Sequence, residues 1–185
     1  MPATATRISI EEYLALPEDG PPWLEYIDGE VVEKPVGTAT HMEIIARLLE
    51  LLFQYRRRVG GRTGPDGRSR FDDPINPRAM LPDVSFFRRG ARLSHPDGTL
   101  HPPTSAVEVR SPGQTMAHQR ARASYYRNHS VEEVWLVDAD NRLVEVWDAG
   151  RDGEIFTTGT LTSTALPGFE ADIVELFTDL TPDFA

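Results

Sequence analysis

Cysteine is absent from this chain of 185 residues, which excludes disulfide bonds, thiolate metal sites and a cysteine nucleophile. Long apolar runs are absent too, because no stretch approaches the roughly 18 residues that a membrane-spanning helix needs. Residues 1–7 are mostly small and polar and no apolar run follows them, so no signal peptide is predicted. We therefore expect a cytoplasmic protein without a membrane segment, folded as a single domain over residues 1–185.

Positive charge is scarce overall, since the formal net charge is −10. A net negative charge disfavours a nucleic-acid partner, but the charges are unevenly distributed. Between Arg47 and Arg92 eleven arginines stand against five acidic residues, a local balance of +6. Between Val131 and Ala185 two arginines stand against thirteen acidic residues, a balance of −11. The basic middle is either a solvated arginine-rich surface or a phosphate-binding face.

The pattern of apolar residues predicts an α/β fold, in which helices pack on a mixed sheet. Ser9 and Glu12 form a capping box at the start of a short helix. The dipeptide Asp28-Gly29 predicts the tight turn of a hairpin over residues 24–34. Apolar residues at helical spacing predict a long helix over 40–59, with Thr40 as its cap. Strands are expected at 68–71, 83–87, 105–110, 133–137, 143–147 and 155–161, and helices at 114–127 and 172–177.

Two acidic residues stand out because they open or occupy consecutive predicted strands. Asp83 begins one strand, and Glu108 lies within the next. Alternation along a strand directs Glu108 and Arg110 to one face and the flanking valines to the core. If the strands are neighbours, Asp83 shares the side of Glu108.

Two neighbouring carboxylates repel each other unless a cation lies between them. Mg²⁺ prefers oxygen ligands, and one or two carboxylates with several waters are a common set. Such an ion activates water and polarises a phosphoryl group, and an adjacent basic residue offsets the charge that develops on the phosphate. The pattern therefore predicts metal-assisted phosphodiester hydrolysis. The alternative is a turn at Asp83 and an ordinary surface ion pair between Glu108 and Arg110.

In order and spacing, these motifs resemble those of the Uma-type family of restriction endonuclease-like proteins, within the PD-(D/E)XK nuclease superfamily. The likeness runs from about Ile8 to Phe177, nearly the whole chain. The matching landmarks are segments 9–16, 24–30 (LEYIDGE), His41, 81–84 (LPDV), 107–112 (VEVRSP), Tyr126, 134–138 (VWLVD) and 166–169 (LPGF).

The resemblance implies a restriction endonuclease-like core, DNA as substrate and a Mg²⁺ site, with Mn²⁺ as an alternative. Asp83 and Glu108 take the family's acidic positions. Glu25 matches the acidic residue of the first hairpin, a third ligand or a water-orienting group, and its alternative is a surface strand residue. His41 matches the histidine that begins the long helix, where a cap or a packing residue is the alternative.

The sequence departs from the family pattern at the catalytic lysine. In many relatives the helix after the Ser-Pro motif reads approximately D-x-x-x-K-x-x-x-Y, whereas here the matching positions hold His118, Arg122 and Tyr126. The only lysine is Lys34, in the predicted hairpin. Arginine can offset charge on a phosphate, but it is a poor general base. The candidate cations for the phosphate are therefore Arg110 and Arg122.

Three functions follow as hypotheses. The leading one is a Mg²⁺-dependent DNA endonuclease, in which Asp83 and Glu108 bind the metal. The second is a catalytically degenerate member that binds nucleic acid or a protein, because the lysine is missing from its usual places. The third is an assembly role for apolar residues near the C-terminal strands, for which packing in the core is the alternative: Trp135, Leu136, Trp147 and Phe156. The family resemblance implies self-association, so a homodimer is expected.

Overall fold

A computed structural model describes residues 7–17 and 20–180. Residues 1–6, on which most of the signal-peptide expectation rests, lie outside these ranges, as do both ends of the predicted domain 1–185. No helix in the described ranges is both long and apolar enough to cross a membrane.

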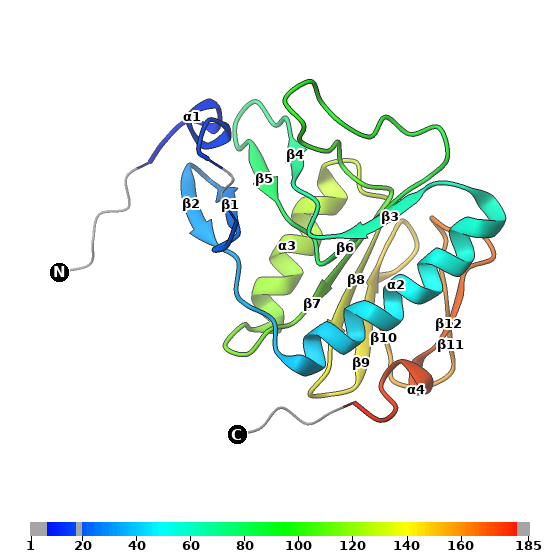
Figure 1. Ribbon diagram of the computed structural model, residues 1–185. Coiled ribbons are helices and arrows are strands. Elements are labelled where there is room, and N and C mark those ends of the chain that lie inside the picture. Colours follow the sequence, from blue (N-terminus) through cyan, green and yellow to red (C-terminus); the bar gives the residue numbers. More distant parts are fainter. Residues whose placement is uncertain (1–6, 18–19, 181–185) are drawn as a thin grey trace.

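A six-stranded mixed sheet forms the centre of the molecule (Figure 1). All of its neighbouring strands are antiparallel except β7 and β8, which run parallel and are joined by helix α3 (Met116–Asn128). A helical crossover is the usual connection between parallel strands. In spatial order the strands are β10 (Asp152–Phe156), β9 (Leu143–Trp147), β8 (Glu133–Asp138), β7 (Ser105–Val109), β6 (Val84–Phe87) and β3 (Arg62–Pro65).

A second, antiparallel sheet lies beside the first and is entered through the N-terminal hairpin. Its strands, in spatial order, are β2 (Glu30–Glu33), β1 (Leu24–Ile27), β5 (Arg78–Met80) and β4 (Ser69–Phe71). Because β5 ends at Met80 and β6 begins at Val84, residues 81–83 carry the chain from this sheet to the central one. Short helix α1 (Ile10–Leu14) precedes the hairpin.

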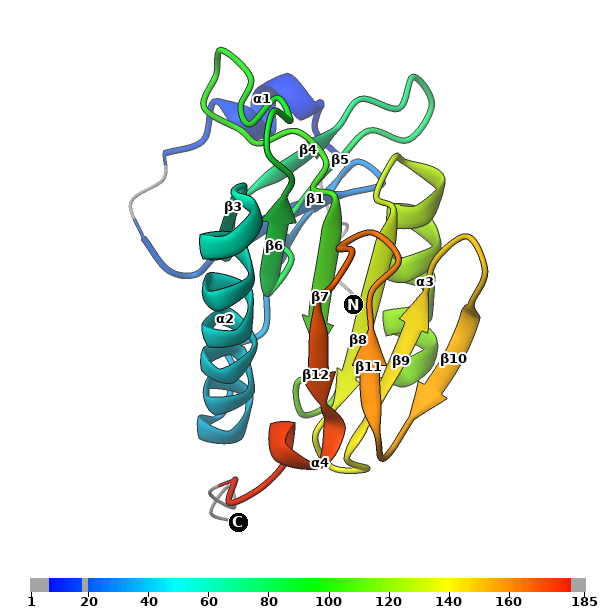
Figure 2. The ribbon, with the colours of Figure 1, turned by 90° about the vertical axis from the view of Figure 1, so that its right-hand side faces the viewer.

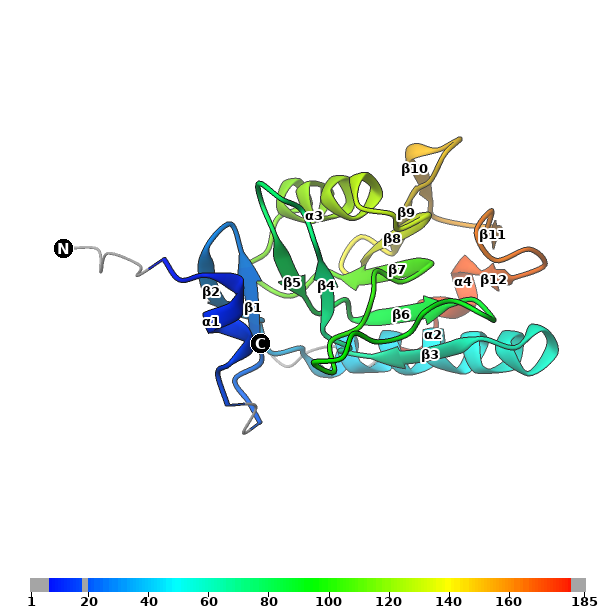
Figure 3. The same ribbon diagram turned by 90° about the horizontal axis from the view of Figure 1, so that it is seen from above.

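Two helical layers cover opposite faces of the central sheet (Figure 3). The long helix α2 (Ala39–Val59) packs its apolar stripe, including Ile44 and Leu48, against one face. The pair β11 (Thr160–Thr162) and β12 (Glu170–Asp172) and helix α4 (Ile173–Leu176) lie on the same face (Figure 2). Helix α3 covers the other face through Ala123 and Tyr126. The site described below lies at the α3 face, where the two sheets meet.

Most of the predicted elements are present, and their local signals act as expected. Ser9 and Glu12 form both bonds of the capping box. Asp28 and Gly29 both adopt positive φ, as the tight hairpin turn requires. The helix cap was wrong: Thr38, and not Thr40, accepts the hydrogen bond from the backbone of His41. Strands β3, β5 and β12 were not predicted, and the strand expected at 155–161 is divided between β10 and β11.

The apolar residues proposed for assembly are mostly buried. Trp135 and Leu136 lie in the interior, on opposite faces of β8. Trp147 and Phe156 are partly buried and pack against the core. Trp135 and Leu136 are therefore core residues, the alternative given for this set, whereas Trp147 and Phe156 are partly exposed.

We predict that truncation of the α2 stripe weakens the whole fold. Leu48→Ala should lower the free energy of unfolding by about 2–5 kcal/mol, because it leaves a cavity between α2 and the sheet. The exposed Met42 on the same helix provides the control, and Met42→Ala should change stability by about 0.5 kcal/mol or less. Urea unfolding of both variants measures the difference, and equal losses would contradict the assigned packing.

Candidate functional site

Strand pairing brings Asp83 and Glu108 together. In the β6–β7 pair Val84 faces Val107, and continuing this register by one residue places Asp83 opposite Glu108. The two valines belong to the core on the α2 face, so the carboxylates project from the other side of the sheet. The structure therefore brings the two predicted acids to the same face of neighbouring strands.

The carboxylate of Asp83 is buried and held by three groups. Its Oδ2 accepts a 2.6 Å hydrogen bond from the backbone N–H of Val109 and lies 3.3 Å from Nε2 of His41. Its Oδ1 lies 2.8 Å from Nζ of Lys34. Burial alone would raise the pKa of Asp83, but the hydrogen bond from His41 and the charge of Lys34 outweigh it and lower the pKa to about 2. Asp83 is therefore a stable anion.

The carboxylate of Glu108 is also buried, but its charge is less well compensated. Its Oε1 accepts hydrogen bonds from the Tyr126 hydroxyl at 2.6 Å and from Nη2 of Arg122 at 2.7 Å. Burial raises the pKa of Glu108 to about 7 despite Arg122, and the charges of Asp83 and Glu25 add to the rise. Near neutral pH, Glu108 is therefore the carboxyl group of the site that most readily takes a proton or another cation.

A buried ion-pair network connects the two sheets through Arg122. Its guanidinium binds both carboxylate oxygens of Glu25, at 2.7 and 2.9 Å, while Nη2 also reaches Glu108. Glu25 in turn accepts a 2.7 Å hydrogen bond from the backbone N–H of Leu81. Burial alone would raise the pKa of Glu25, but Arg122 and this backbone donor keep the pKa below its ordinary value. Glu25 is thus a buried partner of Arg122 and not the surface strand residue of the alternative.

Lys34 is the member of the site that the sequence did not reveal. It follows β2 directly, and its ammonium lies between Asp83 and Asp66, at 2.8 and 2.5 Å. Only 11% of its side chain is exposed. Burial opposes its charge, but the surrounding carboxylates of Asp83, Glu108 and Asp66 raise the pKa of Lys34 above its ordinary value. The sequence shows that Lys34 is the only lysine of the chain, but only the fold shows that the hairpin places it beside Asp83.

The structure does not bring Arg110 to these carboxylates. Strand β7 ends at Val109, and the guanidinium of Arg110 binds Asp138 at 2.8 Å and also Asp140. Alternation along the strand therefore failed as a guide to Arg110, since the strand ends before that residue. His41, by contrast, joins the site through Asp83.

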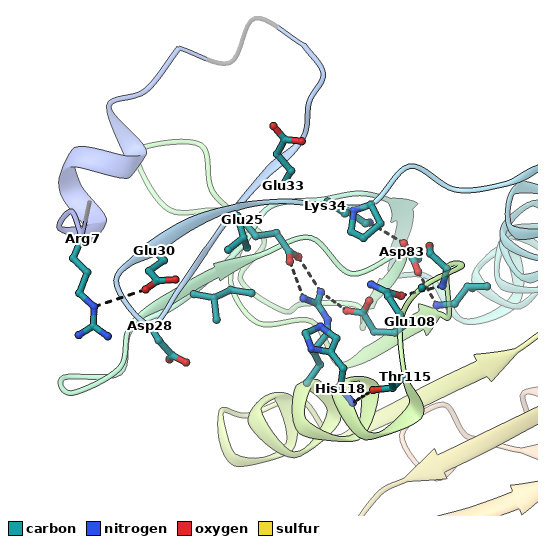
Figure 4. A pocket seen from close by; sticks show the side chains of 18 residues that line it. Arg7, Glu25, Asp28, Glu30, Glu33, Lys34, Asp83, Glu108, Thr115 and His118 are labelled. Carbon is teal, nitrogen blue, oxygen red and sulfur yellow. Dashed lines mark hydrogen bonds and ion pairs between the residues drawn. The ribbon is translucent and has the colours of Figure 1, made fainter. Parts of the chain in front are cut away.

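A pocket of 660 Å³ opens onto the predicted carboxylates, between the β1–β2 hairpin and the start of α3. Figure 4 shows Glu25, Lys34, Asp83 and Glu108 directed toward the same part of it. Carboxylates outnumber cations in its lining. The acids are Glu25, Asp28, Glu30, Glu33, Asp83 and Glu108, and the cations are Arg7, Lys34 and Arg122. A free phosphate would be repelled by this lining unless an additional cation accompanied it.

The carboxylates retain acceptor capacity for such a cation. A carboxylate has about four lone-pair sites. In Asp83 the contacts to His41 and Val109 occupy Oδ2, whereas among the described residues Oδ1 accepts only from Lys34. In Glu108 both contacts fall on Oε1, and none to Oε2 is found in the described part of the chain. Within residues 7–17 and 20–180, no group of three or more His, Asp or Glu side chains is arranged to hold a metal ion. The acceptor capacity left on Oδ1 of Asp83 and Oε2 of Glu108 fits the smaller set of two carboxylates that Mg²⁺ accepts, completed by water and substrate oxygens.

Comparison with known proteins identifies the family. The model of the Uma2 family, described as "Putative restriction endonuclease", matches residues 10–176. The chain belongs to the Uma2 family. No curated protein matches it. Membership confirms the family indicated by the sequence motifs and supports a nuclease role.

A solved structure shows the same fold as this Uma2 chain. It is the crystal structure of "a putative nuclease belonging to DUF820" from Anabaena variabilis, with a TM-score of 0.80 and 22% sequence identity. The match covers 94% of this chain and 99% of the other. The mixed sheet flanked by helices is thus a restriction endonuclease-like core, as predicted.

We predict that the loss of Arg122 destabilises the fold in a pH-dependent way. Arg122→Met leaves Glu25 and Glu108 buried without their cation and should cost about 3–5 kcal/mol at pH 8. In the variant, the pKa of each of these carboxyl groups lies above its value in the unfolded chain. The folded state therefore loses stability as the pH rises and the buried carboxyl groups ionise. The deficit relative to wild type should therefore be smaller at pH 5 than at pH 8.

Urea unfolding at both pH values measures this deficit. Arg70→Met serves as the control, because its partners Asp72 and Asp97 are exposed or partly exposed and the pair contributes about 0–1 kcal/mol. A deficit for Arg122→Met that matches the control, or that shrinks as the pH rises, would show that the buried network does not hold the sheets together.

Proposed function

We propose that this Uma2 protein is a Mg²⁺-dependent DNA endonuclease that hydrolyses phosphodiester bonds. The observation that carries the proposal is the pairing of Asp83 and Glu108, which lie opposite each other on neighbouring strands and line one acid-rich pocket. Such a pocket attracts a divalent cation and, with the cation bound, accepts a phosphate.

The protein groups divide into ligands and the groups that position them. Asp83 and Glu108 would hold Mg²⁺, or Mn²⁺ in its place, and the bound ion would supply activated water and a polarised phosphoryl group. His41 and the backbone of Val109 fix the Asp83 carboxylate. Arg122, oriented by Glu25, and Tyr126 fix the Glu108 carboxylate. These contacts keep both ligands in place before a substrate arrives, which lowers the cost of organising the site.

Nucleic acid is supported as substrate by the arrangement of arginines around the central sheet. Four arginines line a hollow of 400 Å³ at the end of β6 opposite to Asp83: Arg56, Arg62, Arg88 and Arg89. Clustered arginines in a chain of net charge −10 form a local positive surface. A polymer of phosphates can contact this surface while one of its phosphodiester bonds lies elsewhere on the protein.

A specific observation favours a second candidate, the catalytically degenerate binding module. Lys34 already occupies Oδ1 of Asp83, and Arg122 and Tyr126 already occupy Oε1 of Glu108. If these protein cations satisfy the carboxylates fully, the chain binds nucleic acid or a protein without binding a metal. Activity and metal binding separate the two functions.

We predict DNA cleavage that requires Mg²⁺ or Mn²⁺ and both carboxylates. Asp83→Asn and Glu108→Gln should each lower the cleavage rate on the order of 100-fold or more, because each removes a charged ligand of the Mg²⁺ that would offset the charge developing on the phosphate. Glu175→Gln alters an exposed carboxylate on α4 and should leave the rate unchanged. The assay uses supercoiled plasmid, linear duplex and single-stranded DNA, and intact substrates under all metals would refute the nuclease proposal.

Metal binding can be tested without turnover. Calorimetric titration with Mn²⁺ should show one site in the wild type, and Glu108→Gln should abolish the heat of binding. Glu175→Gln again serves as the matched control. DNA binding without any Mn²⁺ binding would favour the degenerate module.

A further inference from the structure

Lys34 and Arg122 both bring positive charge to the pocket, but they differ in what they can still bind. Arg122 uses Nη1 and Nη2 for Glu25, and Nη2 also contacts Glu108 and Tyr126. Of its five N–H donors, Nε and one on Nη1 have no partner within the described ranges, and Nε is buried. Three of the five donors, including both on Nη2, are thus already committed to side chains of the protein.

The ammonium of Lys34 has a donor to spare. A lysine carries three N–H donors, and two acceptors, Asp66 and Asp83, account for two of them. The third has no acceptor within residues 7–17 and 20–180. Lys34 lines the pocket beside Asp83, so this donor is available at the position where a ligand of the carboxylates would lie.

Arg110, the other candidate for this role, points elsewhere. Its guanidinium is engaged by Asp138 and Asp140, and it does not line the pocket. Of the cations considered from the sequence, Arg110 does not line the pocket, and Arg122 is held by Glu25, Glu108 and Tyr126. Lys34 lines the same pocket, and within the described ranges its ammonium is held by Asp66 and Asp83 alone.

We propose that Lys34 is the residue that contacts the phosphate of a bound nucleic acid, and that it acts through its positive charge and its free N–H donor. The inference rests on the proposed function, because it assigns the substrate phosphate to the same pocket. Contact with two carboxylates favours the charged ammonium over the neutral amine. Lys34 therefore stabilises negative charge and does not remove a proton.

The single lysine provides a direct test by NMR. Protein labelled with ¹⁵N only at lysine side chains gives one Nζ signal, and Lys34→Arg removes it, which assigns the signal without ambiguity. A short phosphorothioate duplex in the presence of Ca²⁺ is the probe. We expect the Nζ signal to shift in parallel with duplex binding measured by fluorescence anisotropy. A duplex that binds without moving the signal, or an absence of binding, overturns the proposal.

Two further titrations identify the source of the phosphate. Inorganic phosphate should move the Nζ signal only at much higher concentration than the duplex, because it lacks the contacts of a polymer. Sodium chloride at the same ionic strength controls for screening. If chloride moves the signal as far as the duplex does, the shift reports screening and the phosphate contact is refuted.

Kinetics separate a phosphate contact from a structural role. Lys34→Met should lower kcat/KM by about 100- to 1000-fold, because one charged donor to the phosphate is lost. Lys34→Arg keeps the charge, so its kcat/KM should be at least about tenfold higher than that of Lys34→Met. If Lys34 transferred a proton, arginine would not restore activity, because it does not give up a proton readily. Any of three outcomes overturns the proposal. Lys34→Met could retain full activity, Lys34→Arg could fold but be inactive, or activity could be lost only in Arg110→Gln.

Variants that fold poorly are recognised by urea unfolding.

Asp66→Asn removes the ion pair between Asp66 and Lys34 but keeps the Lys34 ammonium and its contact with Asp83. If the phosphate contact is decisive, this variant should keep most of the activity. A loss equal to that of Lys34→Met would mean that the ion pair to Asp66 is what matters. The two proposals can fail separately. If the wild type binds DNA and the Nζ signal shifts, but no metal supports cleavage, the nuclease proposal is refuted and the phosphate contact of Lys34 is retained. If DNA is cleaved, but the Nζ signal does not shift and Lys34→Met remains active, the nuclease proposal is retained and the phosphate contact is refuted.

Discussion

One buried guanidinium makes the rest of the site possible. Arg122 places its charge between Glu25 from the hairpin sheet and Glu108 from the central sheet. Burial of either carboxylate alone would cost several kcal/mol. The planar guanidinium can bind Glu25 with two nitrogens and still reach Glu108, whereas a compact ammonium has no such fork. The junction of the two sheets therefore depends on an arginine at this position of α3.

This use of arginine explains how the proposed nuclease site can lack a lysine at its usual place. The helix position carries a cation that bridges carboxylates, and the hairpin carries a cation with a donor to spare. The two tasks, which one lysine could combine, are divided here between Arg122 and Lys34. The site nevertheless remains one positive charge short, because Glu25, Asp83 and Glu108 face only these two cations in the buried centre. Burial is the main cause of the raised pKa of Glu108, and the charges of Asp83 and Glu25 add to it, so a divalent ion bound there would favour the ionised carboxylate.

Much of the fold and part of the site could be predicted from the sequence, because the relevant signals are local. The capping box of α1, the Asp28-Gly29 turn and the apolar stripe of α2 each lie within a few residues. The strands that escaped prediction have three or four residues and weak β signals. In β3, for example, the sequence Arg62-Thr-Gly-Pro includes two residues that strands disfavour, and pairing with β6 overrides that preference.

The convergence of Asp83 and Glu108 followed from alternation and strand adjacency, but Lys34 could not be found that way. Its place depends on where the end of a hairpin in one sheet meets Asp83, the residue directly before a strand of the other sheet, and no periodicity predicts that contact. Arg110 shows the opposite error: the local pattern placed it beside Glu108, but β7 ends first and Asp138 captures its side chain. A motif thus located the acids of this site because they share a strand pair. The cations come from separate elements and are placed by tertiary contacts, so a lysine absent from the motif can still be present in the pocket.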